Sequence, residues 1–171
     1  MAKIDSTEKL TGSLSEVYYK EYCDQTDWAY VSLEQIHERG IKNGILKFRK
    51  GFDRVYVKIP EEIIPEIEEI SKPTNDSKYN PHYVYDFLAC KVGNKKRFNY
   101  TIEYKKKWHF VWVEVKTGYS ELTPNQIQTL KKISLRLFRF RIPYPFGEPH
   151  EVDIYKDEVD SKFLREHNLV S

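Results

Sequence analysis

The chain has 171 residues, of which 40% are hydrophobic and 15% aromatic, and its 28 Lys and Arg stand against 26 Asp and Glu. A chain of this length forms one domain and buries roughly 70% of the surface of its unfolded state, so it needs neither disulfides nor a structural metal for a core. The composition excludes intrinsic disorder as the main description. The lack of any apolar stretch near about 18 residues excludes a membrane-spanning helix.

The cysteine count bears on the cellular compartment. Cys23 and Cys90 are the two cysteines, too few for a disulfide framework or a zinc cluster. The first ten residues, MAKIDSTEKL, contain no apolar signal segment. We therefore expect a cytoplasmic protein that does not bind a membrane.

The first half of the chain predicts a helix, a hairpin and a second helix. The sequence SLSE at 13–16 has the form of a capping box and begins an amphipathic helix that reaches about Cys23. Residues 44–60 alternate apolar and charged side chains around a central glycine, which is typical of a hairpin with a polar outer face. The acidic residues 61–71 then predict a short helix, and residues 72–81, with Pro, Asn and Asp, a loop.

The second half predicts two buried strands, a capped helix and a third strand. Residues 82–92 and 108–118 are nearly continuous apolar stretches, which indicates burial on both faces of a sheet. The sequence TPNQ at 123–126 begins a helix with a capping box, and the strand that follows at 137–146 is ended by prolines. This order of elements predicts a single α/β domain over residues 1–171. Beyond it, the acidic tail contains a short helical pattern, DSKFLREHN.

Charge is segregated along the chain. Residues 39–58 and 91–107 each contain seven basic residues and one acid, and residues 131–141 contain five basic residues and no acid. Acidic residues are concentrated at 61–69 and in the tail at 148–171. Such blocks predict basic and acidic faces, although each block alone is also explained as a solvated surface. The first two blocks are predicted basic hairpins, the second projecting beyond the sheet between the two buried strands.

The two buried strands contain charged side chains. Because side chains alternate along a strand, Trp112, Glu114 and Lys116 share one face. Charges in strands this apolar are costly unless they are paired or bind an ion, and the same holds for Asp86 in the preceding strand. Two carboxylates suit Mg²⁺, and a nearby lysine can orient or deprotonate a water molecule. The alternative is a cross-strand ion pair of Asp86 with Lys116 in an inactive fold, which leaves Glu114 unexplained.

An acid followed two residues later by lysine is by itself a weak signal. The spacing occurs four times, beginning at Asp76, Glu103, Glu114 and Asp160. Only Glu114 combines an apolar strand, an acid in a second apolar strand and a capped helix directly afterwards. The other three lie in polar sequence, where they are solvated and need no metal.

The motifs YDFLA, VEVKTG and LTPNQ together resemble the catalytic core of the PD-(D/E)XK nuclease superfamily. This superfamily includes restriction endonucleases, archaeal Holliday junction resolvases and virus-type replication-repair nucleases. The resemblance covers residues 12–141 and is strongest over 83–131. It implies a restriction endonuclease-like α/β fold, with a mixed central β-sheet flanked by helices, and hydrolysis of DNA with Mg²⁺, for which Mn²⁺ can substitute.

The resemblance also implies roles for individual residues. Asp86 and Glu114 would bind the metal, the carbonyl of Val115 would be a further ligand, and Lys116 would position the attacking water. Tyr85 stands where the family name expects proline, a position that shapes the backbone and does no chemistry. The separation between Asp86 and Glu114 is longer than usual in the family.

Two accessory residues have both a functional and a structural explanation. Gln126 matches the accessory catalytic glutamine of the family, and it is also the residue that a capping box requires. Glu16 matches the N-terminal catalytic and metal-binding glutamate of resolvase-like members, and it is equally explained as the capping-box glutamate after Ser13.

The basic blocks predict contact with a nucleic acid. They would hold the DNA backbone without reading its sequence. The side chains expected at phosphates are Lys47, Arg49, Lys50, Lys95, Lys96, Arg97, Lys105, Lys106 and Lys107.

The same sequence leaves three alternatives for substrate and function open, and it also predicts an oligomeric state. RNA is an alternative substrate, and a non-catalytic nucleic-acid-binding module and a structural subunit that binds an acidic protein are alternative functions. The aromatic segment 137–146 predicts an apolar surface patch, from which, by analogy with junction resolvases, we expect a homodimer.

Overall fold

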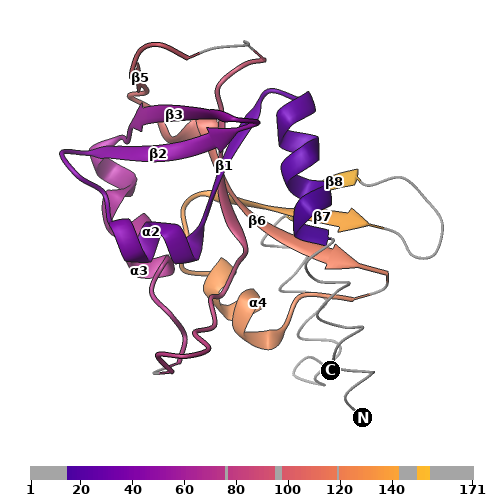
Figure 1. Cartoon of the computed structure of the whole chain (residues 1–171). Coiled ribbons are helices and arrows are strands. Elements are labelled where there is room, and N and C mark those ends of the chain that lie inside the picture. Colours follow the sequence, from indigo (N-terminus) through magenta and orange to yellow (C-terminus); the bar gives the residue numbers. More distant parts are fainter. Residues whose placement is uncertain (1–14, 76, 95–97, 119, 143–149, 155–171) are drawn as a thin grey trace.

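The computed structural model describes residues 15–75, 77–94, 98–118, 120–142 and 150–154. They form one mixed sheet of eight strands in the order β5-β3-β2-β1-β4-β6-β7-β8 (Figure 1). The strands are β1 (Trp28–Ser32), β2 (Ile45–Lys50), β3 (Asp53–Lys58), β4 (Phe87–Lys91), β5 (Ile102–Glu103), β6 (Phe110–Thr117), β7 (Arg136–Ile142) and β8 (His150–Ile154).

Helices flank this sheet. A first helix covers residues 15–25. The other helical elements are α2 (Leu33–Arg39), the 3-10 turn η1 (Glu61–Ile63) that continues into α3 (Ile64–Ile70), the turn η2 (Lys107–His109) and α4 (Pro124–Leu130). The predicted α/β class is confirmed. None of the helices within the described ranges is long and apolar enough to cross a membrane.

Four central strands position the site. β1 is antiparallel to β4, β4 is antiparallel to β6, and β6 is parallel to β7. A parallel neighbour requires a crossover, and the connection through α4 provides it. The segment between β1 and β4 contributes α2, the β2–β3 hairpin and α3, which extend the sheet on one side.

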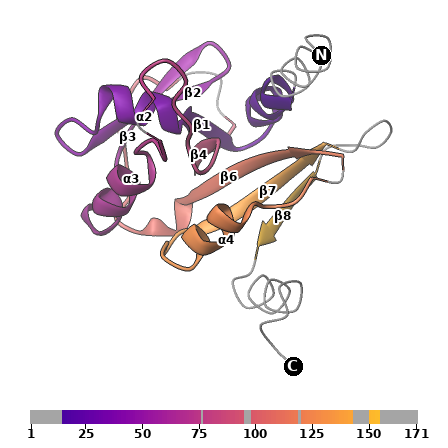
Figure 2. The same cartoon turned by 90° about the horizontal axis from the view of Figure 1, so that it is seen from below.

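The two faces of the central strands are covered by different helices (Figure 2). The first helix packs on one face, and α2, α3 and α4 pack on the other. This arrangement explains the continuous apolar sequence of β4 and β6, because both faces of these strands are buried. The central residues of the first face are Tyr19, Cys23, Phe87, Val111, Val113 and Phe140, and those of the second are Leu33, Ile67, Leu88, Trp112, Leu130 and Leu137.

Several predicted elements are confirmed with changed limits. The hairpin at 44–60 is β2–β3, with Gly51 in its turn at a φ of 61°, a conformation that favours glycine. The acidic helix is η1 with α3. The helix that begins at Thr123 ends at Leu130, because the chain turns there to begin β7 at Arg136.

Other predictions are wrong. The described parts of residues 91–107 do not pair with each other as a hairpin: β5 pairs in parallel with β3, and Phe98, Ile102 and Tyr104 pack against the core. These aromatic and branched side chains bury apolar area and so hold the segment against the sheet. β8 lies in the predicted acidic tail and pairs with β7. The helix expected at 160–168 and the capping residue Ser13 lie outside the described residues.

Glu66 ties the acidic helix to the sheet. The indole N–H of Trp112 donates to Oε2 of Glu66 at 3.1 Å, and the backbone N–H groups of Ser134 and Leu135 donate to its two oxygens at 2.5 and 3.2 Å. One carboxylate therefore satisfies the indole of Trp112 in β6 and two backbone donors at the turn that leads into β7. Part of the acidic block is thus structural and not a solvated surface.

Replacing Glu66 by alanine should lower the free energy of unfolding by about 2–3 kcal/mol, because it leaves the indole and two backbone donors without an acceptor. Urea denaturation followed by tryptophan fluorescence measures this change. Glu68→Ala, on the exposed side of the same helix, is the control and should be nearly neutral. Equal effects of the two substitutions would contradict the role of Glu66.

Candidate active site

Asp86, directly before β4, faces Glu114 on the neighbouring strand β6. Phe87 pairs with Val113, and the N–H of Asp86 donates to the carbonyl of Val113 at 3.0 Å, so Asp86 lies opposite Glu114 where the pairing of β4 with β6 stops. Glu114 is 5% exposed. Burial, a hydrogen bond with Asp86 and the charge of Asp86 raise the pKa of Glu114 well above its usual range. The two predicted metal-binding carboxyls are therefore brought together.

Val115 belongs to the same edge. Its N–H donates to Oδ2 of Asp86 at 2.7 Å. The N–H and C=O of one strand residue point to the same side, so the carbonyl of Val115 also faces the edge that β4 has left free. Two carboxyls and one carbonyl thus lie together where the pairing of β4 with β6 stops.

Lys116 follows on the face of Glu114. It is half-buried, and its charge acts to lower the pKa of Glu114, against the stronger effects of burial and Asp86. Within the described ranges Lys116 has no hydrogen-bond or ion-pair partner, and the cross-strand pair with Asp86 is not formed. Its ammonium therefore keeps its donors for a ligand.

Gln126 caps its helix and also contacts the buried carboxyl of Glu114. The capping box with Thr123 is complete, with distances of 3.0 and 3.2 Å. The side-chain amide of Gln126 also donates to Glu114 and, at 2.9 Å, to the carbonyl of Val84. The hydroxyl of Tyr85, the residue before Asp86, donates to the carbonyl of Gln126 at 2.9 Å. These bonds fix α4 and the carboxyl of Glu114 relative to each other.

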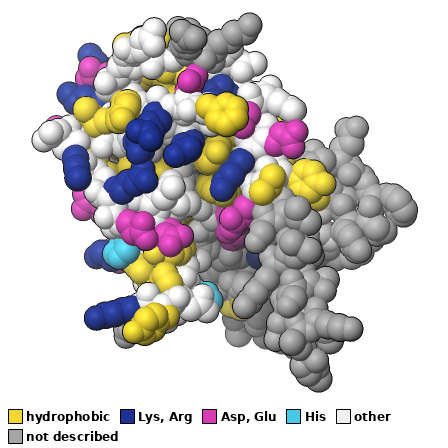
Figure 3. Space-filling view, viewed as in Figure 1, with side chains coloured by type: hydrophobic (Ala, Val, Ile, Leu, Met, Phe, Trp, Pro, Cys, Tyr) yellow, Lys and Arg dark blue, Asp and Glu magenta, His cyan; other side chains and the backbone are white. Residues whose placement is uncertain are grey.

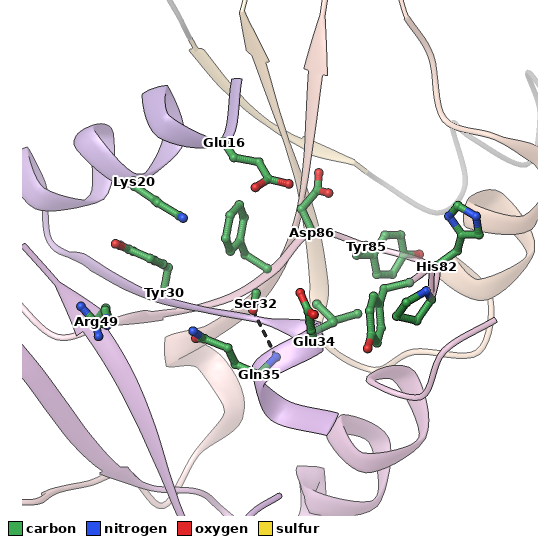
Figure 4. A pocket seen from close by; sticks show the side chains of 14 residues that line it. Glu16, Lys20, Tyr30, Ser32, Glu34, Gln35, Arg49, His82, Tyr85 and Asp86 are labelled. Carbon is green, nitrogen blue, oxygen red and sulfur yellow. Dashed lines mark hydrogen bonds between the residues drawn. The ribbon is translucent and has the colours of Figure 1, made fainter. Parts of the chain in front are cut away.

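A cleft of about 650 Å³ opens beside Asp86. Glu16, on the first helix, points its carboxyl toward that of Asp86 across this cleft (Figure 4). Burial and then the charge of Asp86 raise the pKa of Glu16. The structure therefore brings Glu16 to Asp86, which lies between Glu16 and Glu114.

The cleft contains residues that sequence reasoning missed. Glu34 and Gln35 line it from the start of α2, and Tyr30 lines it from β1. Ser32 accepts a hydrogen bond from the N–H of Gln35 at 3.2 Å as the cap of α2. The sequence Ser-Leu-Glu-Gln at 32–35 has the form of a capping box, a signal that would have located this helix. Lys20 and Arg49 contribute positive charge to the same cleft.

The oxygens of Asp86, Glu114 and Val115 are too few to hold a metal ion with protein ligands alone, and they suit Mg²⁺, which keeps several water ligands. Among the described residues, no three His, Cys, Asp or Glu side chains form a group that would hold a metal ion by itself. Mg²⁺ is usually bound by one or two carboxylates, with water and substrate oxygens completing its shell. Asp86, Glu114 and the Val115 carbonyl supply that number of oxygens. A divalent cation would also offset the repulsion that raises the pKa of Glu114.

Lys50 is not available to a phosphate, contrary to the sequence-based prediction. Its side chain is 6% exposed, and its ammonium donates to the backbone carbonyls of Cys23 at 2.7 Å, Thr26, and Trp28 at 3.2 Å. These are carbonyls at the end of the first helix and the start of β1, which a buried cation satisfies. Lys50 is therefore a structural residue that anchors the β2–β3 hairpin to the first helix.

The second basic block lies far from the acidic pair. Lys105, Lys106 and Lys107 precede β6, whereas Lys116 lies near its end, about 20 Å further along at the usual rise of a strand. Lys95, Lys96 and Arg97 lie outside the described residues. Lys47 and Arg49, in contrast, are on β2, and Arg49 lines the cleft.

The one alternative acid–lysine pair within the described residues, at Glu103, does not form a second site. Glu103 is exposed and lies 3.8 Å from the ammonium of Lys58 on the neighbouring β3. An exposed pair of this kind is solvated. Asp76 and Asp160 lie outside the described residues.

The described part of the aromatic segment expected to mediate dimerisation, residues 137–142, is largely internal, and residues 143–146 lie outside the described residues. β7 lies between β6 and β8, and Leu137 and Phe140 are completely buried. Phe138 is partly buried and contacts Trp28. The segment 136–142 therefore offers no extended apolar surface, and the homodimer stays a prediction without this support.

Comparison with known proteins gives no relative. No protein-family model, curated protein or solved structure matches the chain. The geometry of the site and the motifs in the sequence are therefore the observations that bear on function.

Proposed function

We propose that the protein is a metal-dependent nuclease that hydrolyses phosphodiester bonds of DNA, of the PD-(D/E)XK type. The observation that supports this most directly is the opposed pair Asp86 and Glu114 at an open sheet edge. Beside it lies Lys116, which has no hydrogen-bond or ion-pair partner among the described residues. The mixed sheet flanked by helices agrees with the fold that the sequence resemblance implies.

In this proposal the carboxyls of Asp86 and Glu114 and the carbonyl of Val115 would hold Mg²⁺. Glu16 lies on the other side of Asp86, and because the three carboxyls do not form a metal-holding group among the described residues, its role as a ligand stays an expectation from the sequence resemblance. The bound ion would supply positive charge for the scissile phosphate and lower the pKa of a water molecule. Lys116 orients the attacking water and offsets the charge that develops on the phosphate. Gln126 keeps the carboxyl of Glu114 in place.

Binding of Mg²⁺ should release protons and become tighter as the pH rises. The pKa of Glu114 is raised, so its carboxyl is protonated at neutral pH and must lose the proton to become a ligand. Isothermal titration in two buffers of different ionisation enthalpy measures this release, which we expect to be close to one proton per ion. Glu114→Gln removes the titrating group. An unchanged release in that variant, or an affinity that falls as the pH rises, would contradict the assignment.

A cleavage panel tests the function itself. Labelled junction, flap, duplex, single-stranded DNA and RNA are incubated with Mg²⁺, Mn²⁺ or chelator. We expect cleavage of at least one DNA substrate with either metal and none with chelator. DNA binding without cleavage in any metal would favour the non-catalytic module, and no DNA binding at low salt would favour a subunit that binds an acidic protein.

Two accompanying predictions concern location and substrate. Cys23 and Cys90 are buried and form no disulfide within the described residues, and the cytoplasmic location stays a prediction from the sequence. DNA is preferred here to RNA on the sequence resemblance alone, and the panel separates the two.

A further inference from the structure

The outer surface of the β2–β3 hairpin carries a cluster of cations. Arg49 on β2 lies directly opposite Arg54 on β3, and Lys47 lies opposite Tyr56. Residues paired in this way, and residues two apart on one strand, point to the same face of a sheet. Arg39, at the end of α2, borders the same surface, because it lines a groove of about 410 Å³ together with Lys47 and Tyr56. We call these five residues the β2–β3 face.

The cations of the β2–β3 face repel one another. Like charges directly opposite on neighbouring strands are destabilising. Partial burial and the charges of Arg39, Arg54 and Arg49 lower the pKa of Lys47. Within the part of the chain that the structure describes, none of these four cations forms an ion pair or a side-chain hydrogen bond. The fold thus keeps an unfavourable concentration of positive charge that an anion from outside would relieve.

The β2–β3 face is continuous with the candidate active site. Arg49 pairs with Tyr30 of β1, and both residues line the cleft that contains Asp86 (Figure 4). Lys and Arg side chains gather over β2 and β3 in the space-filling view, with acidic side chains next to them (Figure 3). A polyanion bound on this face is therefore led directly to the acidic pair.

Aromatic side chains lie among these cations. Tyr56 is 44% exposed, and Phe52, at the tip of the same hairpin, is fully exposed. Surfaces that bind single-stranded nucleic acid without sequence preference combine cations along the backbone with aromatic rings on which bases stack. Exposed rings between unpaired cations fit a strand with accessible bases better than a closed duplex.

We infer that the β2–β3 face binds a single-stranded segment of nucleic acid and guides it into the cleft at Asp86. Arg39, Lys47, Arg49 and Arg54 contact phosphates, and Tyr56 stacks on a base. This inference rests on the proposed nuclease function for the meaning of the cleft. It assigns the approach of the substrate to residues 39–58 and not to Lys105–Lys107 at the other end of β6.

Three double variants of the full chain, each with the same change of charge, test this inference: Arg49→Glu with Arg54→Glu, Lys105→Glu with Lys106→Glu, and Lys131→Glu with Lys132→Glu. Fluorescence anisotropy with chelator present measures binding of a labelled oligo-dT of about 20 nucleotides, longer than common single-strand sites of about 4–16 nucleotides. We expect the first variant to bind at least about tenfold more weakly than either of the others, with a salt slope smaller by about 1–2. If the glutamates disturb folding, Arg49→Gln with Arg54→Gln replaces the first variant. It should still bind oligo-dT more weakly than the other two double variants, with a smaller loss of affinity.

The single-strand assignment has its own test. Tyr56→Ala should weaken oligo-dT binding about fivefold or more without changing the salt slope, because it removes stacking and no charge. Equal losses in the three double variants, or the largest loss at Lys105 and Lys106, would overturn the inference. A blunt duplex bound as tightly as oligo-dT, with no effect of Tyr56→Ala, would overturn its single-strand part.

These outcomes are independent of cleavage. If the Arg49 and Arg54 variants lose oligo-dT binding but the wild type cuts no substrate, the nuclease function is wrong and the binding face still stands. Cleavage of a substrate, together with unchanged oligo-dT binding by the Arg49 and Arg54 variants, would support the nuclease function and overturn the binding face.

Discussion

Replacing Lys116 by alanine should slow DNA cleavage by about 100-fold or more, a loss of transition-state stabilisation on the order of 3 kcal/mol, with DNA affinity nearly unchanged. Lys116 follows Glu114 on the face of the acidic pair, and its removal breaks no hydrogen bond or ion pair within the described residues. One cation among many contributes little to backbone binding. Single-turnover cleavage and equilibrium binding measure the two quantities separately.

The matched control for Lys116 is the exposed acid–lysine pair near β5. Glu103→Ala with Lys105→Ala removes the same sequence spacing from a solvated position and should leave the catalytic step largely intact. If Lys116→Ala cuts as fast as the wild type, or if the control variant is the inactive one, the proposed active site is wrong even for a protein that is a nuclease.

Glu114→Gln should abolish cleavage and, at the same time, stabilise the metal-free protein. Burial and Asp86 raise the pKa of Glu114 above its ordinary value of 4.5. A raised folded-state pKa means that the carboxyl favours folding below about pH 4.5 and that this contribution is lost as the pH rises toward the folded-state pKa. Glutamine stays neutral and still accepts a hydrogen bond from Gln126. We expect the variant to be more stable by about 1–3 kcal/mol at pH 7–8.

Thermal unfolding in chelator across pH 4–8 tests this prediction, with the difference between variant and wild type shrinking toward pH 4. Glu62→Gln, an exposed carboxyl on η1, is the control and should show no such pH dependence. Added Mg²⁺ should raise the melting temperature of the wild type and not of Glu114→Gln, because only the wild type binds the ion. A variant that is less stable at every pH, or that still cleaves, would contradict the assignment of Glu114.

Some features of the site were determined by the sequence alone. The alternation of side chains placed Trp112, Glu114 and Lys116 on one face, and the structure confirms that Trp112 and Val113 contribute to opposite layers of the core. The capping box of Thr123 and Gln126 located the start of α4. These predictions depend on neighbours a few residues apart, where backbone geometry fixes which side chains share a face or a helix end.

Other features were decided only by tertiary structure. Sequence could not show that Lys50 is buried under the first helix, that Arg49 lines the cleft, or that Lys105 lies at the far end of β6. A basic block in the sequence states the charge of a segment but not which end of the sheet it reaches. The position of a segment in the sheet depends on the pairing of strands far apart in the chain, such as β1 with both β2 and β4, and on which face each helix covers. Neither of these is encoded in local periodicity.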